Sequence, residues 1–172
     1  HPDVERVKHV HHAGNSSGIV DGAAAVLVAN EAGGKAMGLK PRAKVRAFAN
    51  IGSDPALMLT GPIDVTRKVL KRSGMAFEDI DLIEIHEAFA AQVLANVAAW
   101  EQGWRGAATG PVDWQRVNVN GSSVAVGHPW AAAGGRILTT LAYEMARRNA
   151  RRGLISICAA GGMAGAFLLS RR

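Results

Sequence analysis

Three residues capable of acid–base or nucleophilic chemistry stand at predicted strand ends or turns: His86, His128 and Cys158. Residues 80–85 and 154–157 are short apolar runs typical of buried strands, and they lead into His86 and Cys158. Ligands of open α/β sheets gather at such strand ends. A thiol near a base acts as a nucleophile or an acid–base group. The alternative for Cys158 is a small buried residue, although its glycine-rich flank argues against that interpretation.

His128 lies between a glycine-rich turn, residues 118–127, and a helix predicted over residues 131–147. Pro129 suits the first turn of that helix because proline has a fixed φ and no N–H. The positive end of the helix dipole opposes an imidazolium, so the ring is expected to be neutral and able to accept a proton. The alternative interpretation is a turn whose histidine only caps the helix.

The elements that must position these residues alternate between helix and strand patterns. Helices are predicted over residues 31–38, 61–74, 90–100 and 131–147, and strands over residues 45–49, 80–85, 154–157 and 166–169. The last two strands, joined by a glycine-rich turn, predict a hairpin. Residues 23–29 are apolar without a clear period, which indicates a buried strand or a short helix. This alternation predicts a layered α/β sheet.

Composition supports a packed α/β domain and leaves the ligand open. The chain has 172 residues, of which 48% are hydrophobic and only 5% aromatic. That content is ample for a core. The net charge of +6 is compatible with nucleic acid, an acidic membrane surface or a small polyanion such as a nucleotide cofactor. Arg147, Arg148, Arg151 and Arg152 favour an exposed helix end, with a phosphate site as the alternative.

A single cysteine excludes an internal disulfide and fits a reducing compartment. We find neither a membrane-spanning apolar run nor a secretory signal, so a cytoplasmic location is predicted. The chain begins with His1 and not with methionine, which predicts that further residues precede it. His9, His11 and His12 could bind a metal, but no acidic or cysteine ligand stands at a useful spacing and the neighbouring valines suggest a strand. No metal site is predicted.

Six motifs occur in an order that one family shares. They are Gly14-Asn15-Ser16-Ser17-Gly18, Asp21-Gly22-Ala23-Ala24, His86-Glu87-Ala88-Phe89-Ala90, Asn118-Val119-Asn120-Gly121, Gly127-His128-Pro129 and Cys158-Ala159-Ala160-Gly161-Gly162. Such a series is far more specific than any single motif. The chain resembles the C-terminal part of a thiolase, most of all the thiolase subunits of trifunctional fatty-acid oxidation complexes. The resemblance implies a layered α-β-α-β-α fold, with residues 1–38 ending the N-terminal half and residues 39–172 forming the C-terminal domain.

The resemblance also implies an activity and a role for each site residue. A thiolase passes an acyl group from a 3-ketoacyl-CoA to a nucleophilic cysteine and then to free CoA, with CoA as a substrate and no permanently bound cofactor. By this analogy His128 activates the nucleophile and Cys158 carries a proton. His86 stands where many thiolases have asparagine and serves an oxyanion hole. Ser17 contacts the pantetheine arm, and the backbone N–H of Ala160 completes a second oxyanion hole.

The chain departs from the family pattern at three points. The nucleophilic cysteine of the family belongs to the N-terminal half, and Cys158 is not that residue. Trp130 and the alanines after it replace a run that usually contains glycine. Ala160 replaces a commoner glycine, and the lost freedom in φ is expected to affect the oxyanion geometry. We therefore expect this chain alone to be inactive in thiolysis.

Two alternatives remain at this stage. One is a non-catalytic acyl-CoA-binding or assembly module of thiolase-like fold. The other is a condensing enzyme of the same superfamily, although those enzymes generally lack the second cysteine. For the thiolase, the expected partners are acyl-CoA and CoA, a second copy of the chain in a homodimer or homotetramer, and a hydratase/dehydrogenase subunit, without nucleic acid.

Overall fold

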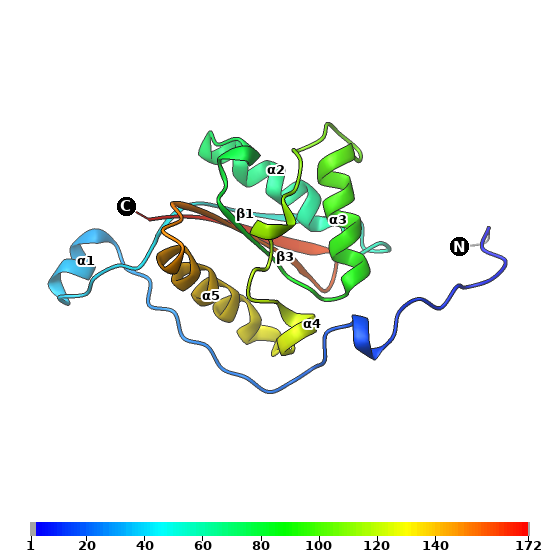
Figure 1. Cartoon of the computed structure of the whole chain (residues 1–172), viewed down its shortest axis with the longest axis horizontal. Coiled ribbons are helices and arrows are strands. Elements are labelled where there is room, and N and C mark those ends of the chain that lie inside the picture. The colour runs from blue at the N-terminus through cyan, green and yellow to red at the C-terminus, as the bar shows by residue number, and fades with distance from the viewer. Residues whose placement is uncertain (1–2, 172) are drawn as a thin grey trace.

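A mixed four-stranded sheet forms the centre of the computed structural model, which describes residues 3–171 (Figure 1). The strands are β1 (Lys44–Gly52), β2 (Leu82–Ile85), β3 (Arg152–Ala159) and β4 (Met163–Ser170), in the order β1-β4-β3-β2. β2 runs parallel to β3, whereas β4 pairs antiparallel with both β3 and β1. The predicted hairpin is confirmed. Only β2 starts later than expected, because Asp81 precedes it and accepts hydrogen bonds from the backbone N–H groups of Arg151 and Arg152.

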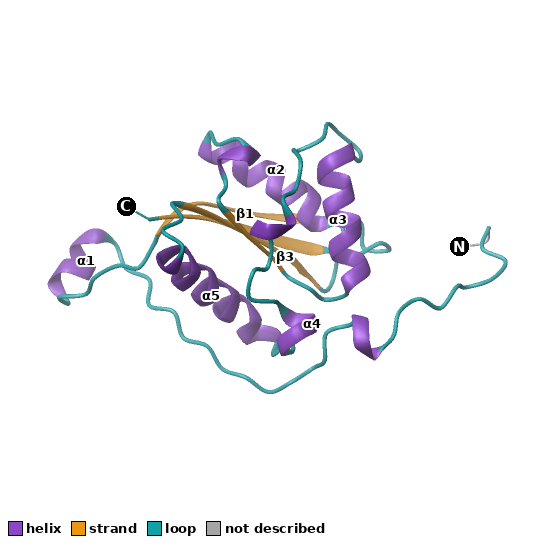
Figure 2. Cartoon of the chain, viewed as in Figure 1, coloured by secondary structure: helices purple, strands orange, loops and turns teal. Residues whose placement is uncertain are grey.

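Helices cover both faces of the sheet, as Figure 2 shows. α2 (Gly61–Ser73) and α3 (Ala90–Gln102) pack on one face, and α5 (Ala133–Arg147) packs against β2 and β3 on the other. α2 has the boundaries that its sequence predicts, with Pro62 in the first turn and Gly74 closing it at φ 68°. The predicted layered α/β fold is confirmed. The described residues form three consecutive layers of the five expected.

The chain between β2 and α5 ends in two short helical turns that surround His128. α4 (Ser123–Val126) precedes the histidine, and a 3-10 turn, η4 (Trp130–Ala132), follows it. α5 therefore begins two residues later than the predicted Ala131. Trp130 has a φ of 41°, in the left-handed region, so the chain cannot enter the α-helix directly after Pro129.

Residues 3–38 run along the outside of these layers and contain only the 3-10 turn η1 (Ala13–Asn15) and helix α1 (Glu31–Ala36) (Figure 1). The prediction that residues 23–29 are buried is wrong, because they lie exposed and belong to no sheet among the described residues. The strand suggested around Val7 and Val10 is also absent, and His12 instead caps η1 by accepting a hydrogen bond from the Gly14 N–H at 3.1 Å. His1 and Pro2, where the chain starts, lie outside the described residues.

Three of the four arginines in the cluster at residues 147–152 form ion pairs. Glu144 binds Arg147 and Arg148, and Asp79 binds Arg152 at 2.7 Å. These carboxylates compete with a phosphate for the same arginines. Within residues 3–171, no group of three or more histidine, cysteine or acidic side chains gathers as a metal site would require. No helix in that range has the length and apolar character needed to cross a membrane.

Candidate active site

His86 and His128 meet beyond the carboxyl end of β2, with their ring centroids 4.4 Å apart and the planes at 55°. The His86 N–H donates to the Ser156 carbonyl at 2.9 Å, which extends the β2–β3 pairing by one residue. The His128 N–H donates to the Gly18 carbonyl at 2.8 Å. Two of the predicted site residues, 42 positions apart in the sequence, are thus brought together by the sheet and by the extended N-terminal segment.

Asn118 fastens the His128 loop to β2. Its side-chain Oδ1 accepts from the Ile85 N–H at 2.8 Å, and its Nδ2 donates to the Ile85 carbonyl at 2.9 Å. Nδ2 also donates to Glu87 at 2.7 Å, and the other Glu87 oxygen accepts from the Val124 N–H at 3.1 Å. Asn118 has a φ of 45°, a conformation that asparagine tolerates. Asn118 and Glu87 belong to the sequence motifs, but a local pattern does not reveal the contacts by which they hold the loop against β2.

Both histidines are held in the neutral form. Burial lowers the pKa of His86 to about 4, with smaller effects from His128 and the Arg136 cation. Burial and then Arg136 lower the pKa of His128. The predicted neutral state of His128 agrees with this direction, although the causes are burial and Arg136 and not the helix dipole. Its Nδ1 is buried without a hydrogen-bond partner among the described residues, so the ring has an unused polar atom inside the site.

Trp130 forms one wall beside His128. The indole stacks on the imidazole with centroids 5.6 Å apart and planes at 10°, while 57% of the residue remains exposed. The expected proximity of this bulky side chain to the site is confirmed. The indole therefore lies against one side of the imidazole.

Ser123 and Arg136 were not identified as site residues from the sequence, yet Ser123 contacts His86 and Arg136 contacts Ser123. The Ser123 Oγ lies 3.2 Å from the Nδ1 of His86, and the Nη2 of Arg136 donates to the same Oγ at 2.9 Å. The available signal was weak: an arginine beside the apolar residue Ile137 on the inward-facing part of a helix. Such a cation is usually exposed.

Cys158 lies in β3, buried to 5% exposure, and burial raises the pKa of its thiol to about 11. Its side chain shares a strand face with Ser156, whose hydroxyl accepts a hydrogen bond from Thr66 of α2. No hydrogen bond joins the Cys158 sulfur to either imidazole within the described residues. The thiol is therefore a neutral acid at the same edge of the sheet, and its contact with the histidines stays a prediction.

Ser17 contacts the chain after β2, and Ala160 follows β3. The backbone N–H and the hydroxyl of Ser17 both donate to the Ala88 carbonyl, at 3.0 and 2.9 Å, which ties the N-terminal segment to the residues after His86. Ala160 is exposed in the β3–β4 turn. The left-handed positions of that turn are Gly161 and Gly162, at φ 83° and 71°, so Ala160 needs no glycine-like freedom. The expected effect of this alanine on the oxyanion geometry stays a prediction.

Close backbone packing seats the N-terminal segment on the His128 loop. A Cβ on Gly22 would stand 2.6 Å from the Cβ of Pro129, and a Cβ on Gly127 would stand 2.7 Å from a methyl of Val20. Contacts this short require glycine at both positions. Residues 18–22 can therefore pack closely against the His128 turn because Gly22 and Gly127 have no side chains.

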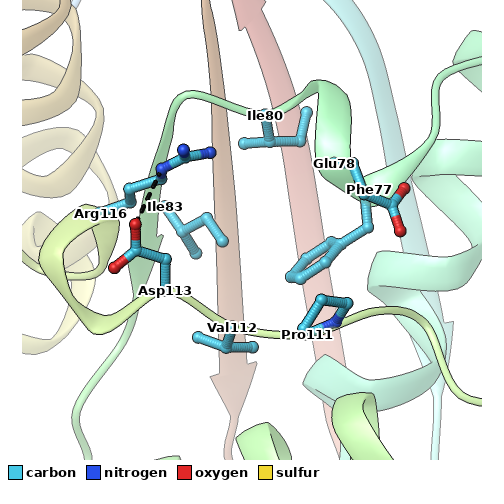
Figure 3. Close-up of a pocket in the computed structure, with 8 residues that line it drawn as sticks. All are labelled: Phe77, Glu78, Ile80, Ile83, Pro111, Val112, Asp113 and Arg116. Carbon is cyan, nitrogen blue, oxygen red and sulfur yellow. Dashed lines mark ion pairs between the residues drawn. The ribbon is translucent and has the colours of Figure 1, made fainter.

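A separate pocket lies at the other end of β2, between η2 (Phe77–Asp79), the start of β2 and the loop through η3 (Trp114–Arg116) (Figure 3). Its lining is mainly apolar, and Asp113 and Arg116 pair with each other at 3.1 Å. Ile80 and Ile83 form its wall at the end of the strand away from His86. The pocket brings no free acid–base pair together, and the histidine site remains the stronger candidate.

Residues 39–171 match the family model described as "Thiolase, C-terminal domain". The chain belongs to the thiolase family. The family predicted from the motifs is thereby confirmed, and the histidine pair, the Cys158 strand and the glycine-rich turn all lie inside the matched range.

Similar proteins carry related names. The chain is 47% identical to an acetyl-CoA acetyltransferase of Allochromatium vinosum and 47% identical to one of Pseudomonas aeruginosa, in each case over 92% of this chain and 38% of the relative. Among solved structures, it matches the Bacillus anthracis acetyl-CoA acetyltransferase with a TM-score of 0.83 and 39% identity, over 92% of this chain and 38% of that one. It matches human mitochondrial 3-ketoacyl-CoA thiolase with a TM-score of 0.83 and 29% identity, over 98% and 40%. The chain thus spans about two fifths of these relatives' length.

Proposed function

We propose that this chain supplies the acid–base side of a thiolase site that cleaves 3-ketoacyl-CoA with CoA, giving acetyl-CoA and a shortened acyl-CoA, or that catalyses the reverse condensation. The observation that carries the proposal is the pair of neutral histidines at 4.4 Å, one of which has a buried ring nitrogen without a partner. A neutral imidazole can take the proton of an attacking thiol. In this scheme His128 activates a nucleophilic cysteine that another part of the enzyme supplies.

Cys158 would act as the proton carrier of this reaction and not as the acyl carrier. Attack of the nucleophile on the keto carbon breaks the bond between C2 and C3, and the electron pair left on C2 needs a proton. A thiol whose pKa is raised to about 11 is protonated at neutral pH and can donate to that carbon. In the second half-reaction the CoA thiol gives its proton to the Cys158 thiolate left by the first step and attacks the acyl-cysteine thioester. Cleavage of that thioester releases the nucleophilic cysteine as a thiolate, which takes back its proton from the His128 imidazolium.

The remaining predicted residues would serve binding and charge stabilisation. His86 donates a hydrogen bond to a thioester oxygen or orders a water there, and the Ala160 N–H serves the second oxyanion. The Ser17 hydroxyl already donates to Ala88, so it would accept a hydrogen bond from an amide of the pantetheine arm. CoA enters as a substrate, with no permanently bound cofactor.

The wider context of the enzyme is also a proposal. The exposed side chains of Ile19, Leu27 and Val28 form apolar surface of the kind that another protein surface covers. We expect the nucleophile-bearing half to cover it. The resemblance to thiolase subunits of trifunctional complexes supports a homodimer or homotetramer, a hydratase/dehydrogenase partner, a role in fatty-acid β-oxidation and a cytoplasmic location. Sedimentation of the purified enzyme and co-purification of hydratase activity test the assembly.

The deciding experiment measures CoA-dependent loss of acetoacetyl-CoA by two proteins. One is the complete polypeptide, which joins the nucleophile-bearing half to this chain, and the other is this chain alone. The complete polypeptide is expected to be active, His128→Ala to lower its turnover by about 10²- to 10⁴-fold, and the chain alone to be inactive because it lacks the nucleophile. Binding of acyl-CoA without turnover by the complete polypeptide would instead identify the non-catalytic module. Decarboxylation of a malonyl thioester would identify a condensing enzyme.

A further inference from the structure

Ser123 is fully buried and stands between two nitrogen atoms. Its Oγ lies 3.2 Å from the Nδ1 of His86 and 2.9 Å from the Nη2 of Arg136. Within the described residues these are the only hydrogen-bond partners of that hydroxyl. The serine hydroxyl must therefore find both its donors and its acceptor among His86 and Arg136.

The guanidinium fixes the first step of this arrangement, because arginine only donates and so takes one lone pair of the Ser123 oxygen. His86 can then either donate from Nδ1–H to the second lone pair or accept the serine proton at a bare Nδ1. In the first case the buried hydroxyl proton has no acceptor, and an unmade hydrogen bond of this kind costs about 1–3 kcal/mol. In the second case all three groups are satisfied.

We infer that Ser123 is a positioning residue that holds His86 in the tautomer with a bare Nδ1 and a proton on Nε2. The doubly protonated ring does not compete near neutral pH, since burial lowers the pKa of His86 to about 4. Arg136 acts through Ser123, because its donation leaves the serine proton free for the histidine.

This tautomer gives His86 a defined chemical role, and only this consequence rests on the proposed thiolase function. Nδ1 faces Ser123, so Nε2–H on the far side of the ring is left without a partner among the described residues and can donate to a substrate oxygen. A neutral N–H donor resembles the side-chain amide of the asparagine that many thiolases have here. The buried serine and arginine would thus let a histidine replace an amide.

The test is ¹⁵N NMR of the histidine rings in the complete polypeptide, with the His86 signals identified by their loss in His86→Asn. The chemical shifts distinguish a protonated from a bare ring nitrogen. We expect a bare Nδ1 and a protonated Nε2 in the wild type, a mixture or reversal of tautomers in Ser123→Ala, and the wild-type pattern in Ser123→Thr, which keeps a hydroxyl. Ser122→Ala is the matched control, because Ser122 is equally buried but its hydroxyl has no partner among the described residues.

Activity gives a second readout. Removing one oxyanion donor lowers turnover by about 10²- to 10³-fold, and kcat should scale with the fraction of His86 in the competent tautomer. An equal mixture of tautomers in Ser123→Ala is therefore expected to lower kcat by about twofold, and a reversal to about 9:1 by about tenfold, with KM little changed. Ser122→Ala should keep its kcat, and Ser123→Thr should recover most of it.

The wild-type spectrum alone overturns the inference if Nδ1 carries the proton, even if Ser123→Ala fails to fold. An unchanged His86 tautomer in folded Ser123→Ala, or the same change in Ser122→Ala, overturns it as well. A complete polypeptide without thiolase activity would refute the proposed function and leave the tautomer measurement able to decide this inference separately.

Discussion

β2 and residues 18–28 are both extended and rich in aliphatic side chains, yet their surroundings differ. Ile83 and Ile85 of β2 are 5% and 0% exposed, whereas Ile19 and Val28 are each 75% exposed. β2 pairs with β3 and lies between helices on both faces, while Ile19 forms only an isolated bridge with His128. His86 thus follows a strand that is buried in the core. His128 instead contacts a segment whose apolar side chains are exposed. Residue type alone does not decide burial; the partners in the fold do.

The largest expected effect is the loss of turnover on substitution of Cys158, which lies in the sheet. Cys158→Ser in the complete polypeptide should slow turnover by about 10²- to 10⁴-fold, because the serine hydroxyl is a poor substitute for the thiol as a proton donor. Steady-state kinetics give the rate, and mass spectrometry of the peptides after incubation with acyl-CoA locates the acyl group. The acyl adduct should still form on another cysteine. Acylation of Cys158 in the wild type, or unchanged turnover in the variant, would contradict the assigned role.

A second effect should appear in the pH dependence of stability, through Glu84 inside the sheet. Burial raises the pKa of this carboxyl from 4.5 to about 8, opposed in part by Arg136. A raised pKa means that the folded state holds a proton that the unfolded state has released, so stability falls as pH rises through this window. The lowered pKa values of His86 and His128 act in the opposite direction below pH 6.5. Between about pH 6.5 and 8 the two histidines therefore do not oppose the effect of Glu84 on stability, given its pKa of about 8.

Glu84→Gln should flatten this decline, which for one fully shifted group approaches about 1.4 kcal/mol per pH unit. Urea unfolding at several pH values measures the slope, and Glu78→Gln serves as the control because Glu78 is exposed. Equal slopes in the wild type and Glu84→Gln would show that the buried carboxyl is not responsible.

The smallest expected effect tests the exposed segment. Gly22→Ala places a Cβ within 2.6 Å of Pro129 and should displace the segment from the His128 turn, a strain of about 1–3 kcal/mol. Gly18→Ala is the matched control, since a Cβ there meets no atom within 4 Å. Hydrogen exchange of the His128 amide, which donates to Gly18, should accelerate only in Gly22→Ala. Equal exchange in both variants would mean that the segment is not seated through Gly22.

Local signals predicted much of the fold. Pro62 and Gly74 marked both ends of α2, and Gly161 and Gly162 marked the β3–β4 turn, because each of these residues has a backbone preference independent of its surroundings. The exposure of residues 23–29 could not be predicted in this way, since an apolar run is buried only where another element covers it.

Local signals likewise indicated part of the candidate site. His86, His128 and Cys158 stood out by residue type and by their positions after strands or turns. The contacts of Ser123 with His86 and Arg136 span 37 and 13 positions and depend on the packing of α5 against the sheet, so no local pattern reveals them. The lowered pKa of His128 was expected from a helix dipole, but burial and the Arg136 cation produce it.

The position of β4 has a consequence for how this domain folds. β4 is the last of the four strands in the sequence, yet it lies between β1 and β3 and pairs with both. Until it is synthesised, β1 has no neighbour in the sheet and β3 lacks one of its two, and the pairing of Lys44 with Ser170 closes a loop of more than a hundred residues. Such distant pairing is slow, and unpaired strand edges can join other chains. During synthesis β1 therefore remains exposed to aggregation until β4 is inserted beside it.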